Sequence, residues 1–266
     1  MSVTLAHLEH PASAGESSPP LLIAHGLFGS ARNFNTLGKR LAVTRRVVMV
    51  DMRNHGLSPW DKDNSYFSMA EDLADAVQRL CGGNAVVMGH SMGGKAAMVL
   101  ALSRPELLAG LIVADIAPVP HTHTHLHFIK AMQAVDLAQI TRRAEADPML
   151  ADAVPEPMLR SFLLQNLTVE NGRAEWRINL AALGENMATL LDFPTDLPEP
   201  AFDGPAYFIH GGASPYVAPE THPRIRALFP AAEIEALPGA GHWLHAEQPE
   251  AFLGKVEGWL RTLRPG

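Results

Sequence analysis

The sequence predicts an α/β fold in which a mostly parallel sheet is flanked by helices. Short apolar, β-prone segments alternate with helical patterns over residues 21–114, and the strand pattern resumes at residue 206. The 266 residues are 47% hydrophobic and 18% charged, which suits one large core carrying an insertion. A Gly-x-Ser-x-Gly pattern, Gly89–Gly93, joins one apolar strand directly to an Ala-rich helical segment.

The N-terminal half consists of short elements in regular alternation. We expect strands at 3–10 (an edge strand), 21–24, 46–50, 85–88 and 108–114, and helices at 30–42, 68–80 and 95–103. In the second helix, Met69, Leu73 and Val77 share one face, and acidic residues occupy the other. Parallel strands joined through helices place all their carboxyl ends at one rim of the sheet.

Between residues 119 and 203 the strand pattern disappears. Helical patterns take its place at 128–135, 137–146, 156–166 and 178–191. We interpret 119–203 as a helical cap over the rim, and 1–118 together with 204–266 as the core. A separate helical domain is the alternative, although the segment is small to bury a core of its own. A cap would exclude water and shape an apolar pocket.

Serine 91 occupies the bend of the Gly89–Gly93 segment, and glycine neighbours allow strand and helix to approach closely around it. The N–H of Met92 would point from a helix N-terminus toward developing negative charge. A second glycine-containing loop, His25–Gly29, follows the strand 21–24, and we assign the other oxyanion-hole donor to Leu27. Ordinary turns are the alternative interpretation of both loops.

The strand pattern returns at 206–210 and 232–237, and a helix at 247–263 closes the chain. His242 follows the last strand on a Gly-rich loop, Gly239–Trp243, at the same rim as Ser91. A histidine in this late position suits the general base of a Ser–Asp–His triad.

These features together resemble the α/β-hydrolase superfamily over almost the full chain: His25–Gly26, the turn at Asp51–Ser58, the Ser91 elbow and His242. The resemblance implies an α/β-hydrolase fold with the helical cap inserted after the sixth strand. In much of that family the triad acid follows the strand that here ends at His210. This chain has Ser214 there, and a hydroxyl cannot balance the charge of an imidazolium.

Asp115 is our candidate for the acid, because it follows the strand 108–114 at the correct rim and preserves the order Ser91, Asp115, His242. Three other carboxylates are less well placed, before a strand or in the exit from the cap: Asp203, Asp196 and Glu199. Ser214 would then be a fourth hydroxyl beside the Asp–His pair. The arrangement looks like that of the YbfF-type small bacterial esterases, which implies short-chain acyl esters as substrates, with acyl thioesters as an open alternative.

The expected function is therefore hydrolysis of short- to medium-chain carboxylic esters, or thioesters, through an acyl-enzyme on Ser91, without metal or cofactor. Four aromatic residues are candidates for the substrate pocket: Phe28, Trp60, Phe128 and Tyr216. A C–C bond hydrolase or a perhydrolase would use the same triad, and a non-catalytic ligand-binding homologue is the alternative from another class. Dehalogenases and epoxide hydrolases of this fold need a carboxylate nucleophile, and residue 91 is serine.

Composition restricts the partners and the setting. The net charge is −7 and no basic stripe is present, so we expect no binding to nucleic acid. No apolar run approaches the roughly 18 residues that span a membrane, and residues 1–20 lack the pattern of a signal peptide. The single cysteine, Cys81, excludes an internal disulfide and favours a cytoplasmic location. The sequence gives no oligomeric state.

Two polar clusters allow more than one interpretation. Asp51, Arg53 and His55 lie at the rim and could be catalytic, but we favour a structural ion pair and turn. Four histidines occupy alternate positions from 121 to 127, which on a strand would share one face and could bind a metal. No carboxylate or cysteine cluster accompanies them, so we favour a loop that enters the cap.

Overall fold

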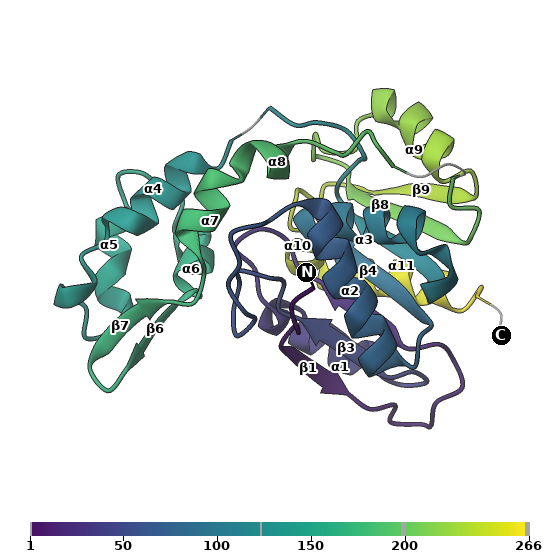
Figure 1. Cartoon of the computed structure of the whole chain (residues 1–266), viewed down its shortest axis with the longest axis horizontal. Helices are drawn as coiled ribbons and strands as arrows, with labels where there is room; N and C mark the ends of the chain where they lie inside the picture. Colours follow the sequence, from purple (N-terminus) through teal and green to yellow (C-terminus); the bar gives the residue numbers. More distant parts are fainter. Residues whose placement is uncertain (1, 123, 198–200, 264–266) are drawn as a thin grey trace.

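The computed structural model describes residues 2–122, 124–197 and 201–263, and its centre is a seven-stranded sheet (Figure 1). The strand order is β1-β3-β2-β4-β5-β8-β9. The strands are β1 (His7–His10), β2 (Leu21–Ala24), β3 (Val47–Val50), β4 (Ala85–His90), β5 (Leu108–Ala114), β8 (Ala206–Gly211) and β9 (Ala232–Leu237). Only the β1–β3 pair is antiparallel among these neighbours, which confirms the predicted fold class.

Helices cover both faces of the sheet. One face packs against α1 (Asn35–Leu41) and α11 (Pro249–Leu260), and the other against α2 (Tyr66–Cys81), α3 (Met92–Ser103) and α9 (His222–Leu228). Successive residues of a strand point to opposite faces. In β3, Val48 therefore packs with the α2–α3 layer and Met49 with the α1–α11 layer. The short helix α10 (Leu244–Glu247) lies just before α11.

Helix α2 begins two residues earlier than the apolar pattern predicts. Ser65 is its N-cap, and its hydroxyl accepts a hydrogen bond from the backbone N–H of Ser68 at 3.3 Å. This bond satisfies one of the amides that a helix leaves unpaired at its start. The helix ends at Gly82, whose φ of 71° is in the left-handed region that glycine adopts without strain.

The middle segment leaves the sheet after β5, which is the fifth strand of this chain and not the sixth. Its helices are α4 (Leu126–Ala134), α5 (Asp147–Leu150), α6 (Pro157–Leu164), α7 (Leu180–Glu185) and α8 (Met187–Leu191). The single helix expected at 137–146 is wrong, because two 3₁₀ turns occupy that stretch. The Glu145 carboxylate accepts hydrogen bonds from the backbone N–H groups of Thr141 and Arg142, which starts a new turn there.

A β-hairpin in this segment was not predicted. It pairs β6 (Leu167–Glu170) with β7 (Arg173–Trp176) in antiparallel register. The two residues between the strands are Asn171 and Gly172, with φ of 51° and 73°. An Asn-Gly pair with two positive φ values is typical of a tight hairpin turn.

The segment from α4 to α8 stands beside the sheet as a separate group of elements in Figure 1, and α8 leads back toward α3. Its buried residues, such as Met132 and Leu163, belong to the same apolar cluster as the α2–α3 face of the sheet. A polar contact also joins this segment to the loop after β3: the backbone N–H of Gly56 donates to the backbone oxygen of Arg177 at 2.8 Å. The division into a core and a cap at 119–203 stays a prediction that this packing supports.

Among the described residues, no helix is both long enough and apolar enough to cross a membrane.

Candidate active site

Ser91 lies in a strained bend between β4 and α3. Its φ and ψ are 52° and −118°, a conformation that few non-glycine residues adopt. A Cβ atom on Gly89 would lie 2.2 Å from the carbonyl oxygen of Gly93, and one on Gly93 would lie 2.5 Å from that of His25. Both glycines are therefore needed for the close approach of β4, α3 and the loop after β2.

Ser91, His242 and Asp115 form a continuous hydrogen-bonded chain. The Nε2 atom of His242 lies 3.2 Å from the Ser91 hydroxyl, and its Nδ1 atom lies 2.7 Å from Oδ2 of Asp115. The Asp115 side chain is fully buried, whereas that of His242 is 20% exposed. A neutral imidazole held by a carboxylate at Nδ1 presents a lone pair at Nε2, so this arrangement can remove a proton from the serine.

The Asp115 carboxylate has two further partners on β8 and the loop after it. Its Oδ1 accepts a hydrogen bond from the backbone N–H of Gly211 at 2.8 Å, and its Oδ2 accepts one from the Ser214 hydroxyl at 2.5 Å. Asp115 itself has a φ of 53°, which turns the chain away at the end of β5. The structure thus brings together all four residues named from the sequence around the nucleophile.

The loop that carries His242 is fixed from two sides. Glu247 at the end of α10 accepts hydrogen bonds from the backbone N–H groups of Gly241 and Trp243, at 2.6 Å and 3.2 Å. His90, the residue before Ser91, lies with its Nε2 atom 2.9 Å from the backbone oxygen of His242. Burial lowers the pKa of His90 well below its usual value, so the ring is neutral and donates this bond through an Nε2–H.

The loop that contains Leu27 is held by side chains from two other elements. The backbone N–H of Phe28 donates to Nε2 of His55 at 3.3 Å, and the backbone oxygen of Phe28 accepts a bond from Asn166 Nδ2 at 2.8 Å. Leu27, Met92 and Ser91 all line one small cavity. Two backbone amides beside a nucleophile are the usual composition of an oxyanion hole, and the first amides of a helix lack intrahelical acceptors.

Two buried histidines support this loop as neutral rings. His25 places Nδ1 2.8 Å from the oxygen of Gly26, while its Nε2 accepts the backbone N–H of Met52 at 2.9 Å. His55 places Nδ1 2.9 Å from the backbone oxygen of Arg53. Burial lowers the pKa of His25 to about 4 and that of His55 to about 3. Each ring therefore donates at Nδ1 and accepts at Nε2, which only the neutral form can do.

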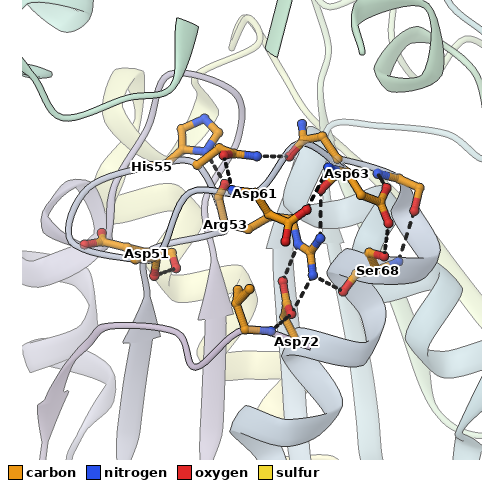
Figure 2. Close-up of polar contacts among 12 residues, drawn as sticks. Asp51, Arg53, His55, Asp61, Asp63, Ser68 and Asp72 are labelled. Atoms are coloured by element: carbon orange, nitrogen blue, oxygen red, sulfur yellow. Dashed lines mark hydrogen bonds and ion pairs between the residues drawn. The ribbon is translucent and has the colours of Figure 1, made fainter. Parts of the chain in front are cut away.

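Figure 2 shows that the turn after β3 is a structural network, as we favoured from the sequence. Arg53 and Asp72 form a buried ion pair with N–O distances of 2.6 Å and 2.8 Å. Asp51 accepts hydrogen bonds from the backbone N–H groups of Ala31 and Leu57, at 2.7 Å and 2.9 Å. None of the side chains of Asp51, Arg53 and His55 lines either cavity that contains Ser91.

Two cavities meet at Ser91. The larger has a volume of about 200 Å³ and is mostly apolar, and its walls include Leu159, Phe162 and Trp243. The smaller has a volume of about 40 Å³ and extends toward α3 and α8. Three of the pocket residues expected from the sequence line these cavities: Phe28, Phe128 and Tyr216. Trp60 does not, because it lies on the loop before α2 and is 56% exposed.

The alternate histidines of the 121–127 stretch are not arranged along one face of a strand. His121 lines the smaller cavity, His125 lines both, and His127 is exposed beside Phe128. His123 lies outside the described residues. Within the described ranges, no group of three or more His, Cys, Asp or Glu side chains could hold a metal ion.

Among the described residues, neither Asp196 nor Asp203, which we considered beside Asp115, forms a hydrogen bond or ion pair with His242. Asp203 and Asp196 are exposed, and Glu199 lies outside the described residues.

Several polar residues around the site were not identified from the sequence. His90 fixes the loop of His242, Asn166 fixes that of Leu27, and Lys95 and His121 line the smaller cavity. His90 and Lys95 lie within five residues of Ser91, so their position in the elbow was a usable signal. Asn166 and His121 lie in the middle segment, and no local pattern connects them with the nucleophile.

Comparison with known proteins shows the family of the chain. The α/beta hydrolase fold family model matches residues 19–249. The chain is 43% identical to the sn-1-specific diacylglycerol lipase ABHD11 of Mus musculus over 251 residues, which cover 91% of this chain and 81% of that protein. It is 36% identical to Esterase YbfF of Escherichia coli (strain K12) over 245 residues, 92% of this chain and 94% of that protein.

Among solved structures, a marine microorganism esterase is 36% identical and superimposes with a TM-score of 0.90 over 97% of this chain and 100% of that one. Relatives named as esterases and lipases confirm the predicted enzyme class, an ester hydrolase. The chain belongs to the α/β-hydrolase family, and within it is similar to the YbfF-type esterases.

Proposed function

We propose that the protein hydrolyses short- to medium-chain carboxylic esters through an acyl-enzyme formed on Ser91. The observation that carries this proposal is the hydrogen-bonded chain from Ser91 through His242 to Asp115, at 3.2 Å and 2.7 Å. The similarity to named esterases and lipases supports the reaction class independently.

In the acylation step, His242 Nε2 takes the proton of the Ser91 hydroxyl as its oxygen attacks the ester carbonyl. The N–H groups of Leu27 and Met92 stabilise the oxyanion, each contributing about 3 kcal/mol. The imidazolium then gives its proton to the leaving alcohol while the C–O bond breaks. Asp115 holds the imidazole in the reactive tautomer and balances its charge.

In the deacylation step, His242 takes a proton from a water molecule that attacks the acyl carbonyl. Collapse of the second oxyanion releases the carboxylic acid and returns the proton to Ser91. The larger cavity, walled by Phe162 and Trp243, suits an apolar acyl or alcohol group. Thioesters follow the same steps with a thiol as the leaving group, so they are included in the proposal as alternative substrates.

Stopped-flow hydrolysis of 4-nitrophenyl esters from acetate to palmitate, with acyl-CoA substrates alongside, tests this function. We expect a burst of 4-nitrophenol close to one equivalent where deacylation is slower than acylation, followed by steady turnover. In the Ser91→Ala variant the burst should vanish while circular dichroism and the melting temperature stay unchanged. Full activity in that variant would contradict the proposal.

Assays of the same purified protein with other substrates distinguish the other functions considered for this triad. A C–C bond hydrolase would cleave a β-diketone and leave simple esters untouched. A perhydrolase would form peracid from acetate and hydrogen peroxide faster than it hydrolyses esters. A binding protein would show no turnover. The cytoplasmic location is likewise a proposal, supported by the presence of only one cysteine, Cys81.

A further inference from the structure

Among the polar side chains that line the smaller cavity beside Ser91, Lys95 and His121 are not used by the proposed mechanism. It is lined on one side by Lys95 of α3 and on another by His121 of the loop that follows β5. Lys95 is one helical turn after Ser91, and its backbone N–H donates to the Ser91 carbonyl. Ser91 lines the same cavity, so a group bound beside Lys95 lies next to the nucleophile.

The Lys95 ammonium group has two hydrogen-bond acceptors of its own. Its Nζ donates to the backbone oxygens of Leu191 and Asp192, at 3.0 Å and 2.7 Å, and lies 5.6 Å from the ring centroid of Tyr66. An ammonium group has three N–H donors. The third has no oxygen or nitrogen acceptor among the described residues, although the side chain is almost fully buried.

The His121 ring lines the same cavity and has an unused acceptor. Its Nε2 atom is buried and has no hydrogen-bond partner among the described residues. A hydrogen bond to the backbone of Ala117 favours the protonated ring, which means that Nδ1–H is the donor to that carbonyl. Burial outweighs it and lowers the pKa of His121 to about 4. The ring is therefore neutral, with its lone pair at Nε2.

A donor and an acceptor thus face one small space, and this restricts what the space can bind. A carbonyl or ether oxygen would satisfy Lys95 and leave His121 Nε2 buried and unpaired, at a cost of about 1–3 kcal/mol. A carboxylate would direct negative charge at the same lone pair. Burial lowers the pKa of Lys95 to about 7, so the ammonium form with its third N–H is populated at and below neutral pH. A hydroxyl group accepts from Lys95 and donates to His121.

We propose that the smaller cavity is a subsite for a hydroxyl group on the small end of the substrate, so that the preferred esters are hydroxy esters. This inference deepens the proposed esterase function and rests on it. The cavity volume of about 40 Å³ holds about three water-sized groups, at roughly 10–15 Å³ each. A hydroxyl two or three bonds from the ester group fits that space. The larger apolar cavity then takes the other end of the ester.

The hydroxyl can come from the acyl side or from the alcohol side of the ester, and two pairs of matched substrates separate these sources. The acyl pair is 4-nitrophenyl 3-hydroxybutyrate and 4-nitrophenyl 3-methylbutyrate. The alcohol pair is 2-hydroxyethyl hexanoate and propyl hexanoate. In each pair a methyl group replaces the hydroxyl, so size is nearly constant. We expect kcat/KM to be at least about tenfold higher for the hydroxy ester in one of the pairs.

In the structure the rings of His121 and Tyr216 lie 5.0 Å apart, measured between centroids. The variant His121→Phe removes the acceptor and keeps an aromatic ring at this position. It should reduce the preference, measured as the ratio of kcat/KM values within a pair, to less than about twofold. The matched control is His222→Phe on α9, where another buried Nε2 has no partner among the described residues but lies outside the two cavities. That variant should keep the wild-type preference.

The outcomes separate this inference from the proposed function. Equal hydrolysis of both members in both pairs by the wild-type protein would overturn the hydroxyl subsite and leave the esterase function intact. A preference that survives in His121→Phe would also overturn it, because the acceptor would then not be His121. Failure to hydrolyse any of the four esters would overturn both proposals.

Discussion

The Nδ1 atom of His242 lies 2.7 Å from Oδ2 of Asp115, a carboxylate supplied by the end of β5. Strand β5 lies between β4, which leads to Ser91, and β8, which leads to Ser214. The end of β5 is therefore between the nucleophile and the loop after β8. The Ser214 hydroxyl donates to the same Oδ2 atom, so it contacts the acid rather than replacing it.

Replacement of Asp115 by Asn should reduce kcat by about 10⁴-fold, because the amide stabilises the wrong imidazole tautomer and cannot balance the imidazolium. The matched control is Asp51→Asn. The Asp51 carboxylate accepts two backbone N–H groups at the rim and does not line the cavities at Ser91. That change should lower the free energy of unfolding by about 1–3 kcal/mol and kcat by less than about tenfold. The opposite ranking in steady-state assays would assign the acid to Asp51.

Ser214→Ala should lower kcat by about tenfold or less, because a hydrogen bond to the Asp115 carboxylate is lost while the charge remains. A second variant tests whether the carboxylate can be relocated. Adding Ser214→Asp to Asp115→Asn should raise kcat at least about tenfold above that of Asp115→Asn alone. No recovery in the double variant, with both proteins folded, would show that a carboxylate at 214 cannot reach His242.

Stability should fall in mildly acidic solution because buried neutral histidines support the loop of Leu27. The pKa is lowered to about 4 for His25 and to about 3 for His55 by burial, against an ordinary 6.5. Between these values the unfolded chain binds protons that the folded chain does not. The stabilisation is thus complete above pH 6.5 and is lost as the pH falls toward 4 and then 3. Each ring changes the free energy of unfolding by at most about 1.4 kcal/mol per pH unit.

Urea unfolding between pH 7.5 and pH 4.5 measures this dependence. The variant His25→Gln loses hydrogen bonds of the buried ring, so its free energy of unfolding at pH 7.5 should be lower. It also lacks one titrating group, so the slope of that free energy against pH should be smaller by about one proton. The exposed His7 provides the control, since His7→Gln should leave both quantities unchanged. A pH slope identical in His25→Gln and the wild type would contradict the neutral-ring assignment.

Removing one partner of the buried Arg53–Asp72 ion pair should lower the free energy of unfolding strongly, whereas removing both should lower it less. Arg53→Met leaves the Asp72 carboxylate buried without its cation, and should lower the free energy of unfolding by about 3–5 kcal/mol. Arg53→Met combined with Asp72→Leu should cost clearly less than the single change. The exposed i,i+4 pair Arg79–Asp75 is the comparison, and Arg79→Met should cost about 0.5 kcal/mol or less. Equal effects of Arg53→Met and Arg79→Met would contradict the prediction.

Much of the fold and of the candidate site could be predicted from short sequence segments, because the most informative patterns span only a few residues. The strand alternation predicted the sheet, and the glycines around Ser91 identified an elbow that only close backbone approach explains. The choice of Asp115 followed from its place at the end of a strand. The geometry now puts it in contact with both His242 and Ser214.

The middle segment was harder to predict, since its short elements depend on capping and on packing against the core. Glu145 ends an apparently continuous helical pattern through two backbone hydrogen bonds. The Asn171–Gly172 turn was a readable signal that the helical periodicity of its surroundings concealed. The presence of both His121 and Lys95 in the lining of the smaller cavity depends on the fold of the whole chain, so no local pattern predicts it.

The most direct test of the central claim is the intact mass of the protein after reaction with a 4-nitrophenyl alkylphosphonate. The account predicts one covalent phosphonyl group per chain, located at Ser91 by peptide mapping, and none in Ser91→Ala. An adduct that persists in Ser91→Ala, or a wild-type protein that hydrolyses esters while its mass stays unchanged, would contradict it.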